Sequence, residues 1–367
     1  MTSSPPRERP VTSATPSTHH SGKPVRRLNP VLVGAVLLAG TALSIVGGMM
    51  FGAATLPFDS VWQVIVGQLG GAPAEPTAVR IIWGLRAPRT ILALAVGAGL
   101  SVAGASIQTL VRNPLADPYL LGISSGASVG ATAVIATGLG GVLSGLSLTS
   151  GALLGALAST ALVFGITRAQ GGITPLRLIL TGTVLASAMS SISSLLIFLS
   201  GEPQAAQAAL FWLLGTLSGA TWQNIWVPVA VVICCSFALM ALSGWLDALA
   251  TGPDVAAALG IPVARLRLSV FVLQAVLVGV LVSSAGGIGF VGLVVPHITR
   301  LLVGSAHRYV LPLAMGTGAL FLLWVDVLAR VLVAPVEIPL SVVTGIVGAP
   351  VFLVLLGRRS YSFGGGR

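Results

Sequence analysis

Asp326 is the one acidic residue deep within an apolar run of this 367-residue chain, and Arg330 follows it four residues later. A carboxylate is costly to bury in lipid, so such a residue is a functional candidate by default. If Asp326 titrates, it could couple proton or sodium movement to transport across a membrane. If it instead pairs with Arg330 across one helical turn, its part is structural.

The residues needed for ATP hydrolysis, metal binding or nucleophilic catalysis do not occur in the required arrangement. ATP hydrolysis needs a phosphate-binding loop ending in Gly-Lys-Ser or Gly-Lys-Thr, whereas the single lysine, Lys23, is followed by proline. His297 and His307 have no carboxylate or thiol spaced as a metal co-ligand, and no nucleophile stands beside a base. The sequence therefore predicts neither an enzyme nor a resident cofactor or metal, and the energy for any work must come from elsewhere.

The composition is that of a polytopic membrane protein. Hydrophobic residues make up 55% of the chain and charged residues 8%, with a mean hydropathy of +0.99, whereas about a quarter of residues are charged in soluble domains. Ten stretches are continuously apolar, which favours helices over alternating membrane strands. Most approach the roughly 20 residues that cross a bilayer. They run over 31–52, 91–110, 119–139, 148–168, 176–199, 224–244, 268–285, 291–303, 310–331 and 340–356.

We therefore predict an all-α membrane protein with about ten transmembrane helices. The run 291–303 is too short to cross alone, so we expect a helix that starts inside the protein or a part of a broken helix. Residues 1–29 are rich in Pro, Ser and Thr and predict a disordered cytoplasmic tail before a permease domain over 30–367.

The basic residues predict the orientation, because Lys and Arg in short loops stay on the cytoplasmic side. With ten crossings and both termini inside, 15 of the 19 basic residues are cytoplasmic. Their distribution explains the net charge of +10 by topology, and no basic surface with interleaved aromatics suggests nucleic-acid binding. The four basic residues left outside are Arg80, Arg86, Arg89 and Arg330.

The two halves of the chain contain a repeated segment. Residues 96–104 match residues 278–286 at Val, Gly, Ser, Ala and Gly positions, and Thr181-Gly182 is echoed by Thr344-Gly345. The predicted topology makes the first copy run inward and the second outward. An inverted repeat of this kind builds the two alternating faces of transporters.

A series of sequence motifs runs in order over residues 31–357. In the first half these are Leu85-Arg86-Ala87-Pro88-Arg89, Gly104 to Gln108, Arg112 to Pro118, and Leu121 to Ala127. In the second half they are Phe211 to Gly215, Val255-Ala256 with Leu259-Gly260, Gly289 to His297, Asp326 with Ala329-Arg330, Glu337-Ile338-Pro339, and Gly348-Ala349-Pro350. This series resembles the FecCD-type permeases, the membrane subunits of ABC importers for ferric siderophores, haem and cobalamin.

The resemblance implies a dimerising permease of the bacterial cytoplasmic membrane, in which a second copy or a paralogue completes the pathway. Two ATPase subunits would bind inside, carrying ATP and Mg²⁺, and an extracytoplasmic binding protein would deliver substrate. Ferric siderophore is the first expectation for the substrate, with haem and cobalamin as alternatives. An ion-coupled carrier using Asp326 is the main rival.

By the same resemblance, Arg86, Arg89 and Arg330 match positions that grip acidic residues of the binding protein. Exposed guanidinium groups suit this, because they pair bidentately with carboxylates. Two alternatives stay open: Arg330 pairs with Asp326, or Arg86 and Arg89 anchor a helix end at the headgroups.

The inner face is predicted from the longest polar segment, residues 247–267, which resembles the family's ATPase coupling loop. Gly252-Pro253 makes a turn before Asp254, which can cap a short helix, and a second short helix can start near Val263. The alternative is an ordinary solvated loop. The coupling candidates are Asp254, Val255, Ala256, Leu259 and Gly260.

The pathway itself has fewer candidates. Asn113-Pro114-Leu115 forms a loop in which the proline restricts Asn113, and in related permeases this loop lines the inner gate, so Asn113 and Leu115 are the gate candidates. The span 176–199 is the richest in hydroxyl groups, and Thr181 and Ser187 are its pathway candidates. Such hydroxyls also bond their own helix backbone.

Overall fold

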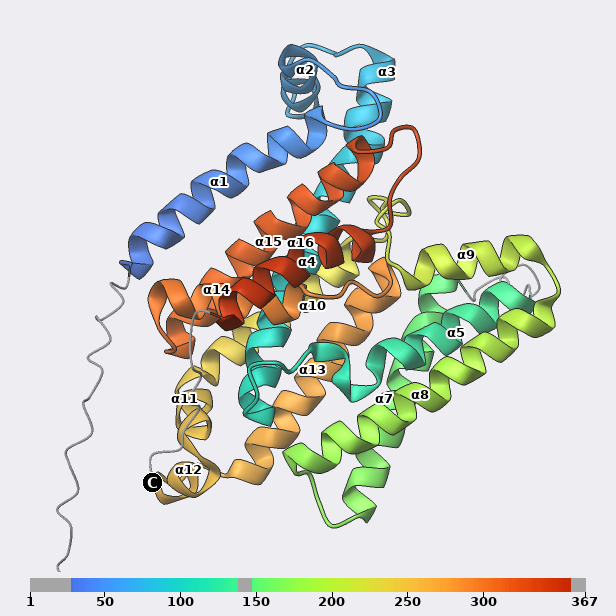
Figure 1. The fold of residues 1–367 in the computed structure, drawn as a ribbon. Coiled ribbons are helices and arrows are strands. Elements are labelled where there is room, and N and C mark those ends of the chain that lie inside the picture. The colour runs from blue at the N-terminus through green and yellow to red at the C-terminus, as the bar shows by residue number, and fades with distance from the viewer. Residues whose placement is uncertain (1–27, 138–146, 358–367) are drawn as a thin grey trace, which may run out of the picture.

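The computed structural model describes residues 28–137 and 147–357, and these form helices joined by short connections (Figure 1). The first half of the chain holds two short helices and an irregular turn between its first two long helices. Its elements are α1 (Pro30–Met50), α2 (Phe58–Gln68), α3 (Pro76–Val79), the π-helical turn η1 (Arg80–Arg86), α4 (Ala87–Val111), the 3₁₀ turn η2 (Pro118–Leu121), α5 (Ile123–Thr137), α7 (Leu148–Ala169), α8 (Pro175–Ser200) and α9 (Pro203–Leu213).

The second half begins after a connection that follows α9. Its elements are α10 (Trp226–Ala241), α11 (Ser243–Thr251), α12 (Pro253–Ala258), α13 (Val263–Ala285), α14 (Val291–Val303), α15 (His307–Val331) and α16 (Leu340–Gly357). Prolines open many of these helices, where a missing N–H costs nothing. Helices α2 and α3 lie at one end of the molecule and α11 and α12 at the other (Figure 1).

The prediction of about ten apolar helices is confirmed. By length and composition, six helices of the described chain can each cross a membrane, and α10 with α11 makes a seventh span that bends by 58°. Three shorter apolar helices, α5, α14 and α16, complete the set. Helix α14 has the bounds predicted from the sequence, and its first residue, Val291, is fully buried, so it does begin inside the protein.

Helix α4 is the centre of the bundle, with nearly every residue buried from Ala87 to Val111. It packs against α15, α14, α13 and α10. Glycine permits two of these contacts: a Cβ atom on Gly97 would overlap the carbonyl oxygen of Gly318 in α15, and one on Gly104 would overlap that of Gly292 in α14. Small residues allow such close approach of helix backbones in lipid.

The two copies of the repeated segment lie on α4 and α13, and these helices run in opposite directions. The amide of Gln274 in α13 donates to the carbonyl of Ala103, 2.7 Å away, while Leu277 and Leu281 lie over Gly99. Residue numbers therefore rise along α13 as they fall along α4. The third apolar helix of each half, α5 and α14, is also a short one. Both features are those expected of an inverted repeat.

We expect Gly104→Val to destabilise the protein, because a side chain there must push α14 away from α4. Overpacking of this kind costs about 1–3 kcal/mol, which thermal unfolding of the purified protein in detergent would register as a lower midpoint. Gly165→Val is the matched control, since Gly165 in α7 is exposed and nothing lies within 4 Å of a Cβ atom there. An unchanged midpoint for Gly104→Val would contradict this packing.

Candidate functional site

A cluster of buried charges lies where α4 meets α15. Arg89, on the first turn of α4, donates from Nε to Oδ1 of Asp326 at 2.9 Å. Its two terminal nitrogens reach the carboxylate of Glu337 at 2.7 and 3.0 Å. Arg330 brings Nη2 within 3.0 Å of the second oxygen of Asp326. Both oxygens of the buried carboxylate thus lie beside a guanidinium group, although Oδ2 has only the ion pair with Arg330 and no hydrogen bond.

Arg330 and a third arginine, Arg86, close the C-terminal end of α1. Arg86 donates to the carbonyls of Met49 and Met50 at 2.8 and 2.7 Å, and also to that of Ala54. Arg330 donates to the carbonyls of Gly48 and Phe51 at 3.3 and 3.1 Å. The last carbonyls of a helix have no partner within it and carry the negative end of its dipole, so cations stabilise them.

Two expectations for these residues are settled by this geometry. The predicted pair of Arg330 with Asp326 is confirmed. The expectation that the three arginines are exposed is wrong, since Arg86, Arg89 and Arg330 are 8%, 8% and 6% exposed. Arg86 anchors the end of α1 within the protein rather than in headgroups. Binding-protein docking through these arginines stays a prediction, and Glu337, whose side chain is 42% exposed, is the accessible member of the cluster.

At the opposite end of the molecule, α11 and α12 form a helical pair joined at Gly252, whose φ of 147° favours glycine. The tip of the pair is apolar and open: Val255 is 49% exposed and Leu259 67%, while Ala256 is buried against the body. Gly260, at φ 77°, ends α12.

The predicted details of this segment need two corrections. Val263 does not open a second short helix but starts the long helix α13, because no proline interrupts the chain between Val263 and Ala285. The partner of α12 is α11, which precedes it. Asp254 lies in the first turn of α12 and makes no capping hydrogen bond, so the predicted cap is wrong.

The predicted gate residues lie in the turn after α4. Arg112 ends α4 in the left-handed conformation, and Asn113 then accepts the N–H of Leu115 on its side chain at 2.9 Å. The carbonyl of Asn113 accepts the N–H of Ala116, which closes a turn around Pro114. Leu115 is 47% exposed at its tip.

The predicted pathway residues lie on α8, which is barely buried. Thr181 is half-buried and Ser187 is exposed. Ser187 belongs to an exposed hydroxyl stripe with a helical spacing of four, three and four residues, which consists of Thr183, Ser187, Ser190 and Ser194. Beside it a small cavity of about 80 Å³ is lined by serines of α5 and α8 together with Ile197 and Leu213.

One polar pair was missed by sequence reasoning. No carboxylate is spaced along the sequence as a metal co-ligand of His307, and no partner was predicted for its ring, but its Nδ1 lies 2.6 Å from Oδ1 of the half-exposed Asp247 on α11. The two residues are 60 positions apart, so spacing gave no signal. Within the described residues no group of three or more His, Cys, Asp and Glu side chains is placed to hold a metal ion.

Residues 32–358 match the FecCD transport family, which is nearly the whole of the described chain. The chain belongs to the FecCD family. Among similar FecCD proteins, the hemin transport system permease HmuU of Yersinia pestis is 36% identical over 91% of this chain and 97% of its own length. The vitamin B12 import permease BtuC of Klebsiella pneumoniae is 41% identical over 76% of this chain and 82% of its own.

A solved structure supports the same assignment. The permease of a metal-chelate type ABC transporter, in an inward-facing conformation, aligns with a TM-score of 0.78 and 32% identity, over 90% of this chain and all of that one. This FecCD protein is therefore a multi-pass transport permease subunit of an ABC importer. Membership implies ATPase subunits on separate chains and a second permease subunit, as the resemblance suggested.

We expect Asp326→Ala to destabilise this FecCD permease strongly, because it leaves Arg89 and Arg330 short of a buried partner. Breaking a buried ion pair from one side costs about 3–5 kcal/mol, which a thermal-unfolding series in detergent would detect. Glu337→Gln is the control: the side chain is 42% exposed, so its loss should cost about 1 kcal/mol or less. Equal midpoints for both variants would refute the structural role of Asp326.

Proposed function

We propose that this permease carries ferric siderophore complexes into the cytoplasm, with haem or cobalamin as the alternative cargo. The support is the class of its similar proteins: a metal-chelate type transporter, a hemin permease and vitamin B12 permeases. A similar molybdate import permease, MolB of Haemophilus influenzae, is 35% identical over 89% of this chain, which makes a small oxyanion a further alternative.

The hydroxyl stripe on α8 is the observation that carries the pathway assignment. Four exposed hydroxyl residues along one face of α8 suit an aqueous pathway better than lipid. One of them, Ser194, also bonds back to its own helix, donating to the carbonyl of Ser190 at 3.0 Å. We infer that Ser187, as part of this stripe, lines the pathway between this chain and a second permease subunit. Thr181 lies on another face of α8, and its assignment to the pathway rests only on the high hydroxyl content of the helix. Asn113 and Leu115 would then close it on the inner side.

The orientation follows from the two ends of the molecule. The open apolar tip of α12 suits insertion into a protein partner, so we assign Val255, Ala256, Leu259, Gly260 and Asp254 to the contact with one of two ATPase subunits, which carry ATP and Mg²⁺. That end is then cytoplasmic. The first described residues lie there as well, since the N–H of Leu28 donates to the carbonyl of Leu302 at the end of α14.

The opposite end, with α2 and α3, then faces outward and receives the binding protein. Docking through Arg86, Arg89 and Arg330 has a structural requirement, because their groups already have internal partners. A carboxylate of the binding protein would have to take the place of Glu337 on Arg89. Glu337 is the partner that solvent can reach.

An ion-coupled carrier is disfavoured by the surroundings of Asp326. Each of its carboxylate oxygens lies within 3.0 Å of a guanidinium nitrogen, from Arg89 on one side and Arg330 on the other. A proton or a sodium ion would have to displace an arginine to bind there. The carboxylate therefore serves as an internal counter-ion.

Uptake of iron-loaded siderophore into proteoliposomes tests the cargo and the energy source together. We expect uptake only when the permease is reconstituted with its co-purifying ATPase, ATP and the binding protein, with haem and cobalamin tested as competitors. Omission of ATP and of the binding protein are the two controls. Uptake driven by a proton gradient without an ATPase would reject the importer assignment and return attention to Asp326.

Acidic substitutions at the exposed apolar tip of α12 test its proposed contact with the ATPase. We expect Val255→Asp combined with Leu259→Asp to lower co-purification of the ATPase at least tenfold, because each apolar side chain buried in a partner contributes about 1.5–3 kcal/mol. Leu69→Asp is the matched control, since Leu69 is 82% exposed after α2 at the other end. Undiminished recovery of the ATPase with the double variant would remove α12 from the interface.

A further inference from the structure

A chain of hydrogen bonds ties α11 to both α15 and α4, close to the turn that leads into α12. Oδ1 of Asp247 lies 2.6 Å from Nδ1 of His307 and accepts the backbone N–H of the same residue at 2.9 Å. On the far side of the ring, Nε2 of His307 lies 2.7 Å from Oγ1 of Thr109, near the end of α4. His307 and Thr109 are buried, at 2% and 5% exposed.

The donors and acceptors in this chain assign its protons. An ionised carboxylate only accepts, so Nδ1 of His307 carries the proton that faces Asp247. With a neutral ring, Nε2 accepts the hydroxyl proton of Thr109. With a charged ring, Nε2 donates to Thr109, whose hydroxyl then donates to the carbonyl of Ala105, 3.1 Å away. The link is complete in both states, and only the Thr109 hydroxyl turns.

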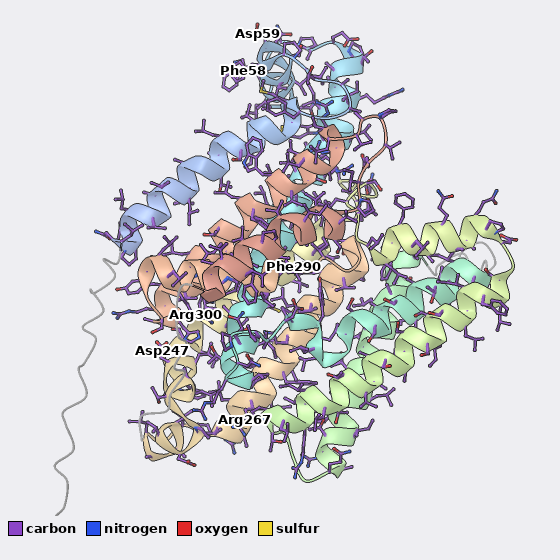
Figure 2. All side chains as sticks on the ribbon, in the orientation of Figure 1. Phe58, Asp59, Asp247, Arg267, Phe290 and Arg300 are labelled. Carbon is purple, nitrogen blue, oxygen red and sulfur yellow. The ribbon has the colours of Figure 1, made fainter. Side chains whose placement is uncertain are left out.

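Asp247 also acts as a cap for a helix to which it does not belong. Helix α15 begins at His307, and its own N-cap residue is Ala306, whose side chain cannot accept a hydrogen bond. The first N–H groups of a helix need an acceptor, and the positive end of the dipole favours an anion there. Asp247 supplies both from the middle of α11 (Figure 2).

The position of Asp247 matters because α11 stands between α12 and the bundle. Helix α12 packs on α11 and touches the start of α13, while α11 contacts α4 and α15. The junction between α11 and α12 is the single residue Gly252. A displacement of α12 therefore reaches α11 directly, and α11 is held to α15 and α4 by polar contacts at Asp247.

We propose that Asp247, His307 and Thr109 are positioning residues that transmit movement of the α11–α12 pair to α15 and α4. We call the chain of hydrogen bonds from Asp247 through His307 to Thr109 the tie. Helix α15 carries Asp326 and Arg330, and α4 carries Arg89, so the tie connects the α12 end to the cluster of buried charges at the opposite end along two rigid helices. The inference rests on the proposed contact of α12 with the ATPase.

Hydrogen exchange of the complete permease–ATPase complex tests the tie without knowledge of the cargo. Exchange is compared with and without ATP and vanadate, in α12, the first turn of α15 and the last turn of α4. We expect the intact protein to respond in all three places. Asp247→Ala should keep the response in α12 and lose it in α15 and α4, and without nucleotide the His307 amide should exchange roughly fivefold faster, as expected for one lost helix cap.

Conservative variants separate positioning from a general loss of structure. Asp247→Asn keeps an acceptor at Oδ1 and should restore all three responses. Thr109→Val should abolish the nucleotide response in hydrogen exchange of α4 alone, whereas Thr109→Ser should restore that response. These two variants also test the tie if Asp247→Ala does not fold. Asp59→Ala is the control for removing a carboxylate, since Asp59 is exposed on α2 at the far end (Figure 2).

Two outcomes would overturn different claims. If α12 itself does not respond to nucleotide in the intact protein, the proposed ATPase contact is wrong. If α12 responds, and α15 and α4 respond equally in the intact protein and in Asp247→Ala, the contact stands and the tie is wrong.

Discussion

The carboxylate of Asp326 between two arginines is the interaction on which one end of this bundle depends. Burial of a charge is tolerated only when it is paired and hydrogen-bonded, and here the pairing joins three separate parts of the chain. Arg89 links α4 to Asp326 on α15, and Arg330, which also contacts Asp326, uses its remaining donors to bind the end of α1. Because Arg89 has two partners and Arg330 three, none of these helices can shift there without breaking a contact of another.

Along the rest of α4 the constraint is steric rather than ionic. Gly97 and Gly104 let α15 and α14 approach to backbone contact, and Gln274 adds a polar link from α13. A central helix packed this closely moves as a rigid rod, because protein interiors transmit strain rather than absorb it. The polar contacts at its two ends, Arg89 and Thr109, are therefore mechanically connected.

Most of the fold could be predicted from the sequence, because a continuous apolar run in a membrane protein has only the helix open to it. The bend of 58° between α10 and α11 could not, because the predicted apolar span 224–244 continues across the break at Leu242. The long helix that starts at Val263 was within reach of the sequence, since no proline follows before Ala285. Among the site residues, Asp326 and Arg330 are one helical turn apart, so their spacing in the sequence was enough to suggest that they pair. Glu337 and Arg89 are separated by 248 positions, so only the tertiary structure brings them together.

The capping of α1 has a consequence for how the chain is made. Helix α1 leaves the ribosome well before α15, and Arg330, which donates to the carbonyls of Phe51 and Gly48, is synthesised 279 and 282 residues after them. Until then Arg86 can cap only the carbonyls of Met49, Met50 and Ala54, and those of Gly48 and Phe51 must find partners in lipid, water or the insertion machinery. Full closure of the bundle at that end is therefore a late event, and a chain truncated before α15 keeps only the contacts of Arg86.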